Sequence, residues 1–221
     1  MRGLSPVRLR KALALLCAVP ALGLGIALCV YADLGSDVYT SFQQGIGLRV
    51  GLPVGTVNLV MSVVLMALYL AFDRSVVGIG SILMCVLLGP CMTFFEGVLR
   101  ALLTGPSMPL RLLLTLAGSA VVAFALAFYI PLDMGVQPMD MIILTIARLL
   151  GRTYGTALYV FNAVMLLLTL ILGGAVGVGT VVNLLCVGKC IDFLMPRLQP
   201  LMRRIEGPGG TEEAGAWTRE N

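Results

Sequence analysis

The second half of this chain repeats the first, and this duplication limits what the chain can fold into. Residues 78–94 match residues 177–193 at an offset of 99, and the tripeptide Asp-Leu-Gly at 33–35 matches Asp-Met-Gly at 133–135 at an offset of 100. We therefore expect two copies of one structural unit, residues 12–104 and 110–198, joined by a linker at 105–109. The matched pairs in the two long segments are Gly78/Gly177, Gly80/Gly179, Ser81/Thr180, Gly89/Gly188, Cys91/Cys190 and Phe94/Phe193.

The composition places both copies in a lipid bilayer. Of the 221 residues, 59% are hydrophobic and 12% are charged, and the mean hydropathy is +1.00. Soluble domains are about 45–50% apolar and about 25% charged, so a soluble core of this size could not bury so much apolar surface. The apolar residues form long continuous runs, which are typical of transmembrane helices and not of a β-barrel with its short alternating segments.

The residue types present argue against most chemistry. The chain has no histidine, which excludes histidine general bases, metal ligands and proton relays. The six cysteines lie inside apolar runs without paired spacing, as small buried hydrophobic residues do. No hydrolase or metalloprotease motif is present. We expect no enzyme activity, no metal, no cofactor and, despite a net charge of +4, no nucleic-acid partner.

The apolar runs predict about six membrane spans, three in each copy. We expect spans at about 12–32, 54–72, 76–103, 110–130, 154–172 and 176–195. Between the first two spans of each copy lies a segment of about 13 residues, which is too short to cross the bilayer. The spacing of its apolar residues predicts a short amphipathic or re-entrant helix. The fold class is thus an all-α, polytopic membrane helix bundle.

Basic residues predict the orientation. Residues 1–11 carry four basic residues and no acid, and the polar segment 199–221 is expected to be a disordered tail. With six spans, most lysines and arginines lie on the side of the termini, so both termini are expected in the cytoplasm of a bacterial cell, with the chain in the plasma membrane. Because three spans is an odd number, the copies should lie in inverted topology, a common architecture of secondary transporters.

A set of spaced motifs resembles a known family. The motifs are the Asp-x-Gly turns, Pro138-Met139-Asp140, a Gly-x-x-x-Gly-Thr segment at 151–156, and a glycine-rich segment that ends in Gly188 to Asp192. Over about residues 15–195 the chain resembles the YczE/YyaS/YitT group of bacterial integral membrane proteins. The resemblance implies a small multi-span protein of the bacterial plasma membrane and little chemistry. The first copy departs from the second in having Val38 and Thr40 where the second has Pro138 and Asp140.

The glycines permit two interpretations. They either let helices and turns pack closely, or they let helix N-terminal amides and a hydroxyl face a bound anion, with Ser81 in one copy and Thr180 in the other. The glycines concerned are Gly35, Gly78, Gly80, Gly135, Gly177 and Gly179.

Ionisable residues at membrane depth are the second group of candidates. Lys189 and Asp192 lie three apart in the last span, and are either an ion pair near the cytoplasmic surface or part of a functional site. Glu96 is expected to form a structural ion pair with Arg100, and a role in substrate or ion binding is the alternative. Asp33 and Asp133 follow a span and precede a glycine turn, where they cap the turn or the next short helix, or else couple to an ion or proton. Further candidates for a polar path between helices are Asn58, Asn162 and Asn183, with Gln43, Tyr154 and Tyr159 as weaker ones.

Two functions remain open at this point. The first is a transporter of a small molecule or ion, with a polar site at mid-membrane between inverted copies. The alternative is a non-transporting membrane protein that binds or regulates a partner, for which an apolar groove without a polar cavity would be evidence. The identity of the molecule and the oligomeric state do not follow from the sequence.

Overall fold

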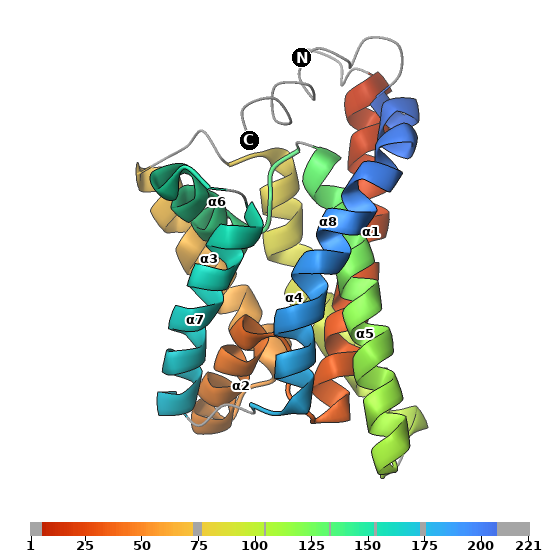
Figure 1. Ribbon diagram of the computed structural model, residues 1–221, viewed down its shortest axis with the longest axis vertical. Helices are drawn as coiled ribbons and strands as arrows, with labels where there is room; N and C mark the ends of the chain where they lie inside the picture. The colour runs from red at the N-terminus through yellow and green to blue at the C-terminus, as the bar shows by residue number, and fades with distance from the viewer. Residues whose placement is uncertain are drawn as a thin grey trace.

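The computed structural model describes residues 6–72, 77–103, 105–132, 134–152, 154–172 and 176–206. These residues form a bundle of helices with short connections (Figure 1). In chain order the elements are α1 (Pro6–Ala32), α2 (Val38–Val50), α3 (Val54–Phe72), α4 (Ile79–Leu102), α5 (Met108–Tyr129), the 3-10 turn η2 (Ile130–Leu132), α6 (Pro138–Leu150), α7 (Tyr154–Leu172) and α8 (Val178–Glu206).

Five of the described helices are long and apolar enough to cross a membrane. They are α1, α3, α4, α5 and α7. Large apolar side chains such as Phe72, Leu102 and Leu170 are exposed on the outside of the bundle, as expected of surfaces that face lipid tails. The chain is therefore a multi-pass membrane protein. The sixth expected span corresponds to the first part of α8, which is not among the five, so the count of six stays a prediction.

The two halves use the same series of helices, and the two middle helices of each half have equal lengths. The short helices α2 and α6 have 13 residues each, and α3 and α7 have 19 each. Figure 1 shows α2 at the lower end of the bundle and α6 at the upper end, with α1 running downward and α5 upward. The red start of α1 and the blue end of α8 lie together at the upper end.

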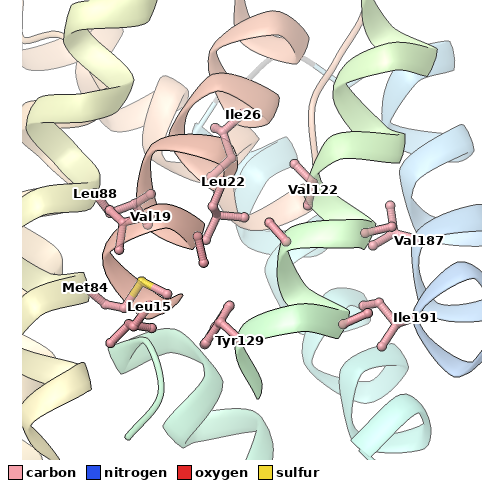
Figure 2. Close-up of a cluster of buried hydrophobic side chains, with 14 of the residues drawn as sticks. Leu15, Val19, Leu22, Ile26, Met84, Leu88, Val122, Tyr129, Val187 and Ile191 are labelled. Atoms are coloured by element: carbon pink, nitrogen blue, oxygen red, sulfur yellow. The ribbon is translucent and has the colours of Figure 1, made fainter. Parts of the chain in front are cut away.

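The hydrophobic core lies where α1, α4, α5 and α8 meet (Figure 2). Leu15 and Leu22 of α1 are almost fully buried against Met84 of α4, Tyr129 of α5 and Ile191 of α8. Since α1 is surrounded on several sides, its apolar residues are not confined to one stripe, and van der Waals packing between the helices stabilises the core. This core holds the first helix of each half, α1 and α5, side by side.

Each short helix is buried at its beginning and exposed at its end. In α2 the residues Val38 to Ser41 are buried, whereas Leu48 and Val50 are exposed. In α6 Pro138 and Asp140 are buried. The N-terminal ends of both helices thus point into the protein, and their C-terminal ends reach its surface. Whether these helices are re-entrant or amphipathic at the membrane surface stays a prediction.

Candidate functional site

The turn after α1 docks onto the beginning of α8. The amide of Gly179 donates a hydrogen bond to the carbonyl of Leu34 at 2.8 Å. Gly35 has a φ of +91°, and a Cβ there would overlap the hydroxyl of Thr180 and lie 2.7 Å from the amide nitrogen of Gly177. Only glycine combines this left-handed conformation with so close an approach.

The turn after α5 docks onto the beginning of α4 in the same way. The amide of Gly80 donates to the carbonyl of Met134 at 2.7 Å. Gly135 has a φ of +101°, and a Cβ there would lie 2.5 Å from the hydroxyl oxygen of Ser81 and 2.8 Å from the amide nitrogen of Gly78. The two contacts are reciprocal, since each half supplies a turn to the other half and receives one from it.

These contacts account for the glycines that the sequence singles out. The amides of Gly80 and Gly179 donate hydrogen bonds to the carbonyls of the two turns. The hydroxyl of Ser81 accepts from the amide of Gly78 at 3.3 Å, and that of Thr180 accepts from the amide of Gly177 at 3.4 Å. Because these groups are already engaged within the chain, the structure supports the packing interpretation of this motif and offers no free amides of Gly80 and Gly179 to an anion.

The carboxylate that caps α2 is Asp37, not Asp33. Asp37 Oδ1 accepts from the amide of Thr40 at 3.0 Å, and burial raises the pKa of the Asp37 carboxyl. Asp33 instead has an exposed side chain whose Oδ2 lies 3.9 Å from Nη1 of Arg111. Its counterpart Asp133 lies outside the described residues.

A second buried carboxylate lies at the beginning of α6. Asp140 is fully buried in the first turn of this helix and accepts a hydrogen bond from the hydroxyl of Tyr129, which is itself buried at the end of α5. A carboxylate in the first turn is also favoured by the helix dipole. The Pro-x-Asp motif therefore places one acid deep inside the protein.

Three neighbouring side chains on α2 and α3 form what we call the polar cluster: Tyr39, Gln43 and Asn58. They are 4%, 0% and 2% exposed. Asn58 Nδ2 donates to Gln43 Oε1 at 3.4 Å. The Tyr39 ring packs against Phe161 of α7 with ring centroids 6.1 Å apart, which places the cluster where α2 meets the second half. The Tyr39 hydroxyl, Gln43 Nε2 and Asn58 Oδ1 have no hydrogen-bond partner in the described structure.

A cavity of about 890 Å³ opens at one end of the bundle, beside α2. Its lining includes Gln44, which follows Gln43 in α2. The buried Oε1 of Gln44 also has no hydrogen-bond partner in the described structure. On its wall Arg100 Nη2 contacts Glu96 Oε1 at 2.8 Å, so the expected ion pair is present. The cavity lies among the ends of α1 and α4 and the beginnings of α3 and α5. Its polar or charged lining residues are Tyr31, Asp33, Gln44, Glu96, Arg100 and Arg111.

The remaining candidates lie apart from the polar cluster. Asn183 is buried in α8 and donates to the carbonyl of Gly179 at 3.0 Å, within its own helix. Asn162 and Tyr159 lie on α7, half-buried and exposed respectively. Lys189 is exposed on the outer face of α8. The side chains of its expected partner Asp192 and of Tyr154 lie outside the described residues.

Sequence reasoning missed Asp37, Tyr39 and Tyr129. A signal for Asp37 was present, because an aspartate immediately before a helical run is a typical N-cap. Tyr39 and Tyr129 carry no such local signal. Their importance follows from contacts with α7 and α6, which a single sequence does not display.

Comparisons with known proteins place this geometry in a family. A family model described as "Family of unknown function (DUF6198)" matches residues 9–196. An uncharacterized protein of Haemophilus influenzae is 26% identical over 182 residues, which is 82% of this chain and 81% of that protein. From Bacillus subtilis, the uncharacterized protein YyaS is 23% identical (79% and 87% covered), and the uncharacterized membrane protein YczE is 23% identical (80% and 81% covered). No solved structure matches the chain.

Proposed function

The chain belongs to the DUF6198 family of unknown function, and from this premise we propose that it is a transporter of a small molecule or ion. The proposal places it in the bacterial plasma membrane, with a binding site between two inverted halves. Five membrane-length helices, and the similarity to YczE, a protein described as a membrane protein, indicate a membrane protein. The transport function is inferred from the interior of the bundle.

Inverted halves are supported by the two docked turns. At one end of the bundle the amide of Gly179 donates to the carbonyl of Leu34, and at the other end the amide of Gly80 donates to the carbonyl of Met134. The short helices α2 and α6 lie at opposite ends, and α1 and α5 run in opposite directions (Figure 1). Inverted repeats with broken or re-entrant helices carry the binding sites of many secondary transporters near the bilayer midplane.

The observation that carries the proposal is the polar cluster on α2 and α3, together with a cavity of about 890 Å³ that is lined by Gln44 of the same helix. Buried polar atoms without partners are rare and destabilising, by about 1–3 kcal/mol each, so their presence in a lipid-embedded core requires a reason. Gln44 lines the cavity and Gln43 belongs to the cluster, so the two are adjacent along α2. The cavity lies at one end of the bundle and mainly within the first half, whereas the sequence predicted one at mid-membrane between the halves.

The charged lining of the cavity favours transport over the alternative of partner binding. A docking surface for a membrane partner would be an apolar groove. Here the lining includes the charged residues Glu96, Arg100 and Arg111 instead. With both termini in the cytoplasm and α8 as the sixth span, this cavity would open to the outside of the cell.

The test is a screen of metabolites and ions against the purified full-length protein. We expect at least one solute to raise the midpoint of thermal unfolding, because a ligand that binds only the folded protein stabilises it. The same solute should be taken up by proteoliposomes that contain the protein and not by empty liposomes.

Two variants make the screen specific. The double variant Gln43→Ile/Asn58→Leu should lose both the thermal shift and the uptake, whereas Lys189→Ala, on the outer face of α8, should keep both. Uptake that is equal in the parent and the double variant would place the site elsewhere. A screen without any stabilising solute and without uptake would contradict transport.

A further inference from the structure

The polar cluster leaves hydrogen-bonding groups unused whichever way its amides are oriented. Side-chain oxygen and nitrogen atoms of Asn and Gln are assigned from their contacts and can be exchanged. In either arrangement the bond between Gln43 and Asn58 uses one oxygen and one nitrogen, and leaves one amide oxygen and one amide nitrogen unused. With the Tyr39 hydroxyl, the described structure presents three groups that a ligand could satisfy.

The fold itself does not require these polar groups. At the repeat-related positions, at an offset of 100, the second half has Met139, Ile143 and Leu158 in place of Tyr39, Gln43 and Asn58. The helices α6 and α7 nevertheless have the same lengths as α2 and α3. Since the same scaffold forms with apolar side chains, the polar side chains of the first half have a purpose other than folding.

The charges around the cluster are negative. Asp37 is the N-cap of α2, two residues before Tyr39. Asp140 is buried in the first turn of α6, and Ile143 of the same helix packs in one buried cluster with Tyr39. No lysine or arginine is among the buried side chains in the part of the chain that the structure describes.

The helix end that could attract an anion here is already occupied. The beginning of α2 carries a partial positive charge, but the Asp37 carboxylate accepts from the Thr40 amide and covers it. Two oxygens of the cluster, the amide oxygen and the Tyr39 hydroxyl, are of the kind that binds hard cations and ammonium groups.

We propose that the polar cluster, together with Asp37, binds a small monovalent cation, either a metal ion such as sodium or the ammonium group of a small amine. This inference rests on the proposed transport function and names the ligand class of its site. The bound cation meets the amide oxygen and the Tyr39 hydroxyl, and the Asp37 carboxylate balances its charge.

The test measures the thermal unfolding midpoint of the purified full-length protein at constant total chloride. The bulky N-methylglucamine chloride provides the baseline and is replaced stepwise by sodium chloride in one series and by ethanolamine hydrochloride in another. We expect a saturable rise in the midpoint in at least one series. A rise with sodium indicates a metal ion as the ligand, and a rise with ethanolamine indicates an ammonium group.

Variants taken from the second half provide the controls. Asn58→Leu should weaken the apparent affinity at least about tenfold, because it removes one charge-assisted contact. Its midpoint in N-methylglucamine should equal or exceed that of the parent, which shows that it folds. Lys189→Ala should respond like the parent.

Two results would overturn the inference: a midpoint that no cation changes, or a rise that Asn58→Leu retains unchanged. The outcome is separable from that of the transport proposal. A neutral or anionic solute whose uptake depends on the cluster would leave transport intact and refute the cation. A saturable rise in the midpoint with a cation, but without uptake of any solute, would support the cation site and contradict transport.

Discussion

The residue Asp37 sets the point at which the chain turns back into the protein. It ends the connection from α1 and caps α2. Its carboxylate accepts a hydrogen bond from the amide of Thr40, which has no acceptor within the first turn of the helix. A half-buried carboxylate without a cation beside it is also a source of instability, because burial favours its protonated form. The cap therefore stabilises the folded protein, whereas the charge destabilises it.

Replacing Asp37 with Asn separates these two effects. Asn is as good a cap as Asp but carries no charge. The pKa of Asp37 is raised in the folded protein, so the folded state is weakened at pH values above that pKa and recovers as the pH falls through it toward about 4, the value of an unfolded aspartate. We expect Asp37→Asn to unfold at a higher temperature than the parent at pH 8, in the absence of small cations. The difference should shrink as the pH is lowered. A constant difference between pH 8 and pH 5 would show that the charge of Asp37 does not matter for stability.

Some of the site could be predicted at this scale and some could not. Asn58 and Asp140 are polar residues in or beside apolar runs, and such residues are candidates by default in a membrane protein. Tyr39 looks like an ordinary aromatic residue of a short helix. Its place in the site follows from its contact with Phe161 of α7, more than a hundred residues away in the sequence.

At the scale of elements, the two halves differ in how closely matched glycines pack. Where α3 meets α4, a Cβ on Gly55 would overlap the carbonyl oxygen of Gly89, and a Cβ on Gly89 would overlap that of Gly55. The repeat-related Gly188 of α8 has room, because among the side chains that the structure describes its Cβ would meet only the hydroxyl of Tyr159, at 3.8 Å. The sequence shows equal glycines in both copies, and only the structure distinguishes the closed contact from the open one.

This difference predicts opposite effects for one substitution. Gly55→Ala should destabilise the protein by about 1–3 kcal/mol, as overpacking does, because backbone atoms on α4 stand in the way. Gly188→Ala should leave the stability unchanged or raise it by up to about 1 kcal/mol, because alanine is the better helix former. Thermal unfolding of the two purified variants beside the parent measures both effects. Equal losses would mean that α8 is packed as tightly at Gly188 as α4 is at Gly89.

For the whole molecule, the long apolar runs predict the helices well, because the bilayer fixes both the length and the composition of a span. The bounds expected for the span at 54–72 agree with those of α3. The site was harder to predict for a physical reason: the buried ends of α2 and α6 and the docked turns depend on contacts between the halves. The turn glycines Gly35 and Gly135 were recognisable in the sequence, but not what they touch.

The proposed inversion of the halves makes a prediction about sidedness. Val50 and Leu150 are repeat-related residues at the exposed ends of α2 and α6, 57% and 50% exposed. In a variant whose six native cysteines are replaced by alanine, a single cysteine at position 50 should react with a membrane-impermeant thiol reagent in intact cells. A cysteine at position 150 should react only after the cells are made permeable, because the positive-inside rule places that end in the cytoplasm. Reaction in permeable cells shows that both positions are accessible in principle. If both cysteines react in intact cells, the copies lie parallel. A transporter built from inverted repeats would then be excluded, whatever ligand the polar cluster binds.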